Sequence, residues 1–320
     1  MLTYLVRRLL LFIPSLLGAS LLIFVLMRVV PGDIAEILVF QAGTEASEVQ
    51  QKQVQQLRSE LGLDLPVLVQ YGEWLARAAR GDLGYSYTQR QPVFEILAER
   101  VPRSMELALL TLVLAVAWAI PSGVLSATHQ NRWIDLVARL LSVCGLALPI
   151  FLIGTLMLFL LVRLFGWSPP LEFVSFSTSP SENLKQLIWP ALAQAFYIGA
   201  PIARLTRSQV VEVLGEDYVR TARAKGLGEL AVVYRHALKN AVLPVITFIG
   251  WWAGRLLGGI VVVETIFSVP GMGSTLMQAV QYRDYPLLQA VVTFIALVFL
   301  TTTLVVDLLY ARLDPRVRYA

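Results

Sequence analysis

Cysteine and histidine, which bind transition metals and carry much covalent and acid–base chemistry, are scarce in this chain of 320 residues. Its one cysteine, Cys144, excludes an intramolecular disulfide and a multi-cysteine metal site. The two histidines, His129 and His236, leave few candidates for zinc binding or acid–base catalysis. Charged residues make up 15% of the chain, against ~25% in a typical soluble domain, while 57% are hydrophobic. These values exclude a soluble single domain, a disordered chain and a secreted disulfide scaffold, and they predict a polytopic membrane protein.

Catalytic motifs are missing as well. No G-x-x-x-x-G-K-[ST] occurs, so the chain is not expected to bind ATP through a P-loop. The glycine-rich stretch Gly271-Met272-Gly273-Ser274 is followed by no lysine and predicts a tight turn. Neither G-x-S-x-G nor H-E-x-x-H is present, and no carboxylate lies in the middle of an apolar run, where ion-coupled transporters usually place one. We therefore expect a membrane protein that is not itself an enzyme.

Long apolar runs are what the chain has in abundance. A helix that crosses ~30 Å of hydrocarbon needs ~20 mostly apolar residues. Five charge-free runs and a sixth, interrupted only by Arg255, meet this requirement. They predict an all-α protein with six transmembrane helices, at Leu9–Met27, Leu107–Thr128, Leu140–Val162, Gln186–Ala203, Ala241–Val263 and Leu287–Val306.

The connections between these runs differ in basic charge. Segments 1–8, 128–139, 204–239 and 311–320 hold 14 Lys and Arg residues, whereas 31–102, 166–185 and 265–287 hold 8. The long 31–102 segment counts little under the positive-inside rule, which leaves 2 on the second side. Both termini are therefore expected in the cytoplasm. This topology also explains the net charge of +4, and no nucleic-acid partner is expected.

Residues 31–102 are too polar to span a membrane and carry helical patterns. One helix is predicted from Ser47 to Gly62, a second from Pro66 to Gly81, and a third over Val93–Arg100 that ends at Pro102. Two interpretations stay open on this pattern. The segment is either a helical cap on the membrane part or a docking surface for an external partner.

The longest inside connection, 204–239, holds seven basic residues around a short predicted helix. Asp217 suits a helix start, and Gly226 is a natural C-terminal stop. Small exposed residues such as Ala222 and Ala224 would let another protein approach closely, with basic side chains beside them. An ordinary basic loop that obeys the positive-inside rule explains the composition equally well.

Eight stretches, in the same order and at compatible places, resemble the permease subunit of ABC-type dipeptide, oligopeptide and nickel importers over essentially the whole chain. They are RVVPGD at 28–33, LGLDLPVLVQYGEWL at 61–75, GDLGYSY at 81–87, DYVRTARAKGL at 217–227, RHALKNAVLP at 235–244, VETIFSVPGMG at 263–273, RDYP at 283–286 and LDPRVRY at 313–319. The resemblance implies the fold of a type I ABC importer transmembrane domain.

The resemblance also implies a coupling helix that docks in a groove of the ATPase subunit. Its residues here would be Asp217, Tyr218, Val219, Arg220, Thr221, Ala222, Arg223, Ala224, Lys225, Gly226 and Leu227. The general family pattern is Glu-Ala-Ala, three further residues and then Gly. Counted back from Gly226, Arg220, Thr221 and Ala222 stand at the first three positions here, so the glutamate is absent. The Leu243-Pro244 pair would open the fifth membrane helix.

From this resemblance we expect four segments: an N-terminal helix (1–30), an extracytoplasmic helical segment (31–102), a transmembrane core (103–311) and a cytoplasmic tail (312–320). The expected partners are a second homologous permease, two cytoplasmic ATPases that bind ATP and Mg, and an extracytoplasmic solute-binding protein. The location would be the cytoplasmic (inner) membrane of a bacterium or archaeon. Di- or oligopeptides are the leading substrates; glutathione-like peptides, nickel chelates and opine-type compounds are alternatives.

Two alternative functions, and two interpretations of Arg255, remain compatible with the sequence. A gradient-driven secondary transporter or channel would need no ATPase, and an assembly factor or scaffold would transport nothing. Arg255, alone among charges within an apolar run, is interpreted either as a contact to substrate or pathway, or as a structural charge. In the second case it pairs with a carboxylate of a partner subunit or extends to the membrane surface.

Overall fold

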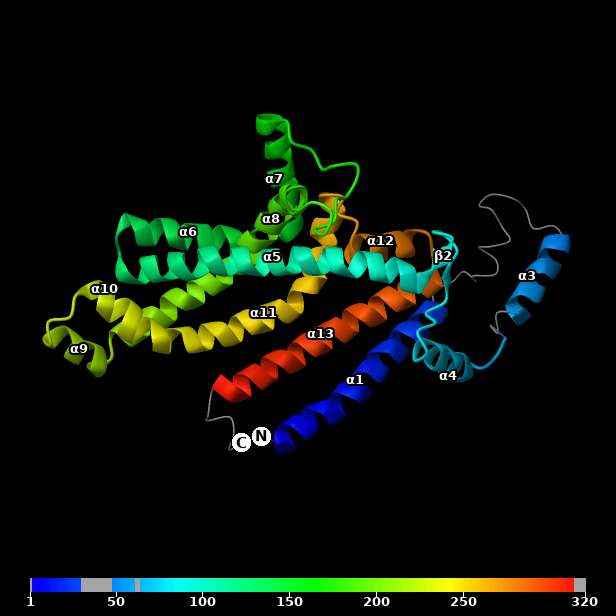
Figure 1. Cartoon of the computed structure of the whole chain (residues 1–320), viewed down its shortest axis with the longest axis horizontal. Helices are drawn as coiled ribbons and strands as arrows, with labels where there is room; N and C mark the ends of the chain where they lie inside the picture. Colours follow the sequence, from blue (N-terminus) through cyan, green and yellow to red (C-terminus); the bar gives the residue numbers. More distant parts are fainter. Residues whose placement is uncertain (1, 30–47, 61–63, 314–320) are drawn as a thin grey trace. The chain divides into compact units, whose positions relative to one another are not determined.

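The computed structural model describes residues 2–29, 48–60 and 64–313, and these are almost entirely helical (Figure 1). The all-α prediction is confirmed for this part of the chain. Two compact units are present. Of the described residues, the large unit contains 2–5, Pro102–Ser274 and 299–313, and the small unit contains those within Val6–Val101 and Thr275–Val298.

The large unit consists of helices that follow one another through short connections. Helices α6 and α11 both lie along α8, and α7 turns away from α6 (Figure 1). In chain order the elements are α5 (Val93–Thr128, from Pro102), α6 (Trp133–Ala147), α7 (Ile150–Phe165), α8 (Pro180–Leu214), α9 (Asp217–Ala224), α10 (Glu229–Ala231), a π-helical segment η1 (Val232–Ala237), α11 (Leu238–Ile266) and the end of α13 (Tyr285–Leu313).

Small residues let these helices approach closely. A Cβ atom on Gly145 of α6 would stand 2.6 Å from Cβ of Ala200 in α8, and one on Gly199 would overlap the indole of Trp118 in α5. Small side chains at helix interfaces are the usual means of tight packing in membranes. The buried core between these helices is built from apolar residues of α5, α7, α8 and α11.

The small unit joins α1 (Leu2–Val29) to α4 (Val67–Ala78) through an aromatic cluster. Phe24 meets Tyr71 edge to face at 5.4 Å between ring centroids, and Tyr71 stacks on Trp74 at 6.1 Å. The Tyr71 hydroxyl also lies 2.7 Å from Oγ of Ser20. The unit further holds α3 (Glu48–Glu60), a two-stranded antiparallel sheet of β1 (Tyr85–Ser86) and β2 (Gln91–Pro92), most of α12 (Met272–Gln281) and the first half of α13.

Three helical spans are long and apolar enough to cross a membrane: Leu10–Val29, Val93–Thr128 and Tyr285–Val306. Two bent helix pairs, Trp133–Ala147 with Ile150–Phe165 and Glu229–Leu256 with Gly258–Ile266, raise this to five within the described residues. The predicted run at Gln186–Ala203 is not among them. It lies in α8, many of whose residues are buried by other helices, so that protein rather than lipid covers them. The count of six and the cytoplasmic termini stay predictions.

Prolines caused the main errors in the predicted helix bounds. The helix predicted to end at Pro102 continues as α5 through Pro102 and Pro121 to Thr128, and Pro244 lies inside α11 rather than opening it. Conversely, the run predicted as one helix over Leu140–Val162 is divided at Leu148-Pro149, where α6 and α7 meet at 110°. Membrane helices tolerate proline where neighbouring groups satisfy the freed carbonyl, so proline alone does not determine where a helix ends.

The predicted bounds of two helices outside the apolar runs agree more closely with the structure. Helix α4 has Pro66 at its N-cap, and Gly81, which follows it, has φ of +85°. The helix predicted from Ser47 to Gly62 is described as Glu48–Glu60; Ser47 and Gly62 lie outside the described residues. The connection predicted to begin at residue 204 is shorter, because α8 continues to Leu214.

Candidate functional site

Helix α9 begins at Asp217, as predicted, and ends in a defined cap at Gly226. The N–H of Leu227 donates to the carbonyl of Ala222 at 3.4 Å, and the N–H of Gly226 donates to that of Arg223 at 2.9 Å. This is the Schellman pattern, which requires a left-handed residue at the position after the cap. Gly226 has φ of +83° and meets this requirement without the cost that a Cβ atom would add.

One face of α9 is fixed to the rest of the large unit. Val219 is completely buried and Ala222 is 6% exposed, and both pack against Val232 of η1, with Leu214 at the end of α8 beside them. The spacing of three residues places the two buried side chains on one side of the helix. The short helix is therefore seated on its apolar face.

Polar contacts hold α9 at both ends. The guanidinium of Arg223 donates through Nε to Oε1 of Glu229 at 2.8 Å and through Nη2 to Oε2 at 3.3 Å, which joins the end of α9 to the start of α10. Near the first turn, the Tyr218 hydroxyl accepts from Nδ2 of Asn240 in α11 at 2.8 Å. Together with the buried face, these contacts make α9 a firmly attached element.

The other face of α9 is exposed and mixed in character. Asp217, Arg220, Thr221, Ala224 and Lys225 are all exposed, so charged groups alternate with small ones. Arg220 makes only a 3.4 Å ion pair with Asp217, which leaves most of its donors directed at solvent. The structure thus brings the predicted residues 217–227 together. Val219 and Ala222 form the buried side of this segment, and the polar and small residues form its exposed side.

The π-helical segment η1 connects this surface to α11. Val232, Val233 and Ala237 of η1 are buried, whereas Tyr234 is 56% exposed. Helices of the π type are rare and occur frequently at functional sites. The buried side of η1 therefore joins the apolar seat of α9 to the start of α11.

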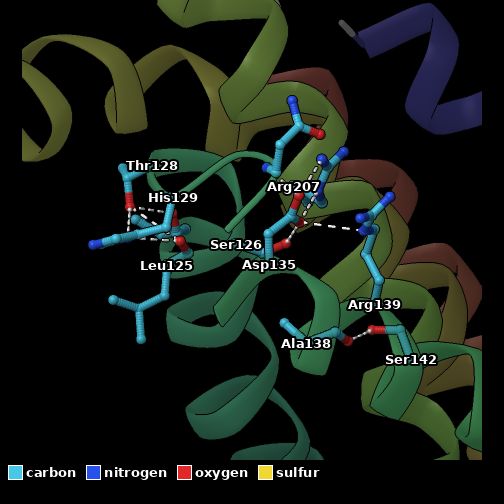
Figure 2. A network of polar contacts seen from close by, with 11 residues as sticks. Leu125, Ser126, Thr128, His129, Asp135, Ala138, Arg139, Ser142 and Arg207 are labelled. Atoms are coloured by element: carbon cyan, nitrogen blue, oxygen red, sulfur yellow. Dashed lines mark hydrogen bonds and ion pairs between the residues drawn. The ribbon is translucent and has the colours of Figure 1, made fainter. Parts of the chain in front are cut away.

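A buried carboxylate ties three elements of the large unit together (Figure 2). Asp135 at the start of α6 is fully buried and accepts from Arg207 of α8, from the Ser126 hydroxyl of α5 at 2.6 Å and from the N–H of Asn131 at 3.0 Å. Arg139 adds an ion pair at 3.5 Å. Every oxygen of the carboxylate is therefore satisfied, as a buried charge requires.

A second buried carboxylate, Glu264 of α11, supports the start of α12. It accepts from the N–H groups of Gly273 and Ser274 at 2.7 Å and 3.1 Å and from the hydroxyl of Ser104. A Cβ atom on Gly271 would overlap this carboxylate. The stretch at 271–274, predicted as a tight turn, is thus a helix start whose free N–H groups are capped by a remote acid.

A third buried acid, Asp284, organises the small unit. Its carboxylate accepts from the Ser86 hydroxyl at 2.6 Å, from the N–H of Thr88 at 3.1 Å and from the N–H of Leu287 at 3.3 Å. It therefore caps α13 and holds the hairpin of β1 and β2. Burial, and after it the charge of Asp284, raise the pKa of Tyr87 in the same hairpin.

Arg255 lies on the exposed side of α11. Its guanidinium carbon stands 4.7 Å from the ring centroid of Trp251, one turn earlier. No carboxylate among the described residues lies within ion-pair distance of it. Nor does any group of three His, Cys, Asp or Glu side chains in the described part of the chain have the arrangement of a metal site.

Comparison of the sequence with known protein families identifies the family of this chain. Residues 119–319 match the family described as binding-protein-dependent transport system inner membrane component, and residues 1–108 match the N-terminal domain of the same membrane component. The chain belongs to this family. It is therefore an inner-membrane permease subunit of an ABC transport system that works with an ATPase and a solute-binding protein, and it is a transport subunit, not an ATPase.

Named relatives agree along the full length. The chain is 38% identical over 319 residues to "Glutathione transport system permease protein GsiC" of Escherichia coli O6:H1, and 37% identical over 339 residues to "Dipeptide transport system permease protein DppB" of Alkalihalophilus pseudofirmus, with 100% of each chain covered. The solved structure "Crystal structure of an amino acid ABC transporter with histidines" aligns with a TM-score of 0.54 at 16% identity, over 68% of this chain and 94% of that one. This last likeness shows the fold alone, that of a type I ABC importer transmembrane domain.

The three buried acids were not recognised from the sequence as sites. Asp284 had a detectable signal, because an acid directly before Tyr285-Pro286 is a typical helix start. Asp135 and Arg139 at a spacing of four residues also predict an ion pair. The contact of Glu264 with Ser104 joins residues 160 positions apart, and no local pattern indicates it.

Proposed function

We propose that the chain forms half of the translocation pathway of an ATP-driven importer of di- or oligopeptides. The observation that carries this proposal is α9, a short helix seated through Val219 and Ala222 with its polar face exposed. An element that transmits force between two proteins must be attached on one side and accessible on the other. Residues Asp217–Leu227 meet both conditions, and we assign them the role of coupling helix.

Peptides are the substrate class that the relatives support. One full-length relative is named for glutathione, itself a small peptide, and another for dipeptides. The chain contributes no cofactor in this proposal. ATP and Mg bind to two partner ATPases, and a second homologous permease completes the pathway. A solute-binding protein delivers the peptide to the segments at 31–102 and 264–286.

In the cycle that we propose, closure of the ATPases pulls on α9. The buried contact to η1 and the Tyr218–Asn240 hydrogen bond pass this displacement to α11. The cavity then changes from facing inward to facing outward, peptide enters from the binding protein, and ATP hydrolysis resets the pathway.

Retention of the ATPase subunits tests the role of α9. In the complete importer purified through a tag on this chain, Ala224→Trp should remove most of the bound ATPase, because a bulky group on the exposed face blocks close approach. Gln130→Trp is the matched control, since Gln130 is exposed on the turn between α5 and α6 and lies outside residues 217–227. Retention of ATPase by Ala224→Trp at the level of Gln130→Trp would contradict the assignment.

A further inference from the structure

The exposed side of α11 differs in chemistry from that of a lipid-facing helix. Its exposed positions include Trp251 and Arg255, which lie one turn apart before the bend at Leu256–Gly258, and Gly258 and Thr265 beyond it. On α5, by contrast, every exposed residue between Met105 and Leu125 is apolar. Lipid therefore suits the exposed face of α5, whereas the exposed side of α11 has a cation that hydrocarbon does not solvate.

Arg255 lies directly before a bend in α11. The helix turns by 57° between Leu256 and Gly258, and Val263, the nearer and outer end of the apolar run, lies beyond this bend. The guanidinium also lies over Trp251, which precedes it by one turn, so the side chain is directed away from that nearer end. The charge must be solvated at membrane depth.

The ring beneath this charge, Trp251, belongs to an aromatic cluster. Trp251 stacks on Phe248 at 5.9 Å and meets Trp252 edge to face at 5.4 Å, and Trp252 contacts Tyr197 of α8 at 5.9 Å. The indole N–H of Trp252 is buried without a hydrogen-bond partner in the described part of the chain. A fixed cation beside aromatic faces suits a ligand that has one anionic group and variable apolar side chains.

We propose that Arg255 is a specificity-determining residue of the translocation pathway and binds the carboxylate of the transported peptide. The inference rests on the proposed importer function. A guanidinium can donate two parallel hydrogen bonds to a carboxylate, which every peptide with a free C-terminus provides. Trp251 holds the guanidinium in place through its ring face. The aromatic cluster then contacts side chains without selecting among them.

Uptake by proteoliposomes that contain the complete importer tests this proposal. Two versions of one tripeptide are supplied on saturating binding protein, the free acid and the C-terminal amide, after the binding protein's affinity for each is measured separately. Arg255→Gln should lower uptake of the free acid about tenfold and change uptake of the amide less than twofold. Arg255→Lys, which keeps the charge but loses the bidentate fork, should fall between Arg255→Gln and the unmodified importer.

Arg163→Gln is the matched control. Arg163 of α7 also lies over an aromatic ring one turn earlier, Phe159 at 5.9 Å, but it stands in the last turn of its helix, near solvent. It should leave both uptakes unchanged. Equal loss for acid and amide in Arg255→Gln would indicate an ion pair with the second permease and overturn the inference, as would no loss at all. Absence of peptide uptake by the unmodified importer would instead refute the proposed function, and the inference with it.

Discussion

Arg207 of α8 donates two parallel hydrogen bonds to Asp135 of α6, from Nε to Oδ1 at 2.8 Å and from Nη2 to Oδ2 at 3.1 Å. The two residues are 72 positions apart in the chain. Because Ser126 of α5 donates to the same carboxylate, this pair connects the end of α5, the start of α6 and the C-terminal part of α8 (Figure 2). One polar network therefore ties these three helices together.

Replacing Asp135 should destabilise the large unit strongly. Asp135→Ala leaves the guanidinium of Arg207, whose side chain is 27% exposed, and the Ser126 hydroxyl without their shared acceptor, a change that typically costs about 1–3 kcal/mol. Thermal unfolding of the purified protein in detergent, followed by tryptophan fluorescence, measures the effect. Arg139→Gln is the control, because this arginine is 49% exposed and pairs at only 3.5 Å; a change of no more than about 0.5 kcal/mol is expected. Equal unfolding temperatures for the two variants would contradict the account.

The cap on α12 predicts a strong effect at one glycine. A Cβ atom on Gly271 would overlap the carboxylate of Glu264 and the hydroxyl of Ser104, so Gly271→Ala should cost about 1–3 kcal/mol through overpacking. Gly72→Ala in α4 meets no atom within 4 Å and should be neutral or slightly stabilising. The same unfolding assay compares the two, and a loss in Gly72→Ala as large as in Gly271→Ala would argue against the packing explanation.

Removal of the Asp284 carboxylate should loosen the hairpin and the start of α13 together. Asp284→Ala deletes a helix cap, worth about 0.5–2 kcal/mol, and leaves the buried Ser86 hydroxyl without its acceptor. Hydrogen exchange should become faster at Thr88 and Leu287, whose N–H groups donate to it. Asp82→Ala, which removes only an exposed acceptor of the Gly84 N–H, should leave Leu287 unchanged. Unchanged exchange at both sites in Asp284→Ala would refute this role.

Alanine substitutions at two glycines after α9 test the role of its C-terminal cap, because only one of the two glycines has a left-handed backbone. Gly226 has φ of +83°, so Gly226→Ala forces a Cβ atom into the left-handed region at about 1–2 kcal/mol. This should shift α9 from its capped to its unwound form by a factor of roughly 5–30 and lower peptide uptake accordingly. Gly228 has φ of −64° and open space around it, so Gly228→Ala should transport normally. The measurement is ATP-driven uptake at equal amounts of assembled importer; normal uptake by Gly226→Ala would contradict the role of the cap.

Local signals sufficed for α9, because an acid at its start and a glycine after its end determine its bounds. They failed at Pro102, Pro149 and Pro244, since whether a proline interrupts a helix depends on what packs around it. The Asp135–Arg207 pair and the contact of Glu264 with Ser104 could not be predicted, because they join helices distant in sequence. The resemblance of the motifs predicted the family correctly. The long-range contacts that hold these motifs in place became visible only in the structure.

Uptake by reconstituted proteoliposomes tests the central claim most directly. Liposomes with this chain, the second permease and the two ATPases, with ATP inside and loaded binding protein outside, should accumulate peptide. Omission of ATP, of the ATPases or of the binding protein should each abolish uptake. Peptide uptake by this chain alone, driven by an ion or proton gradient without ATP, would identify a secondary transporter and contradict the account.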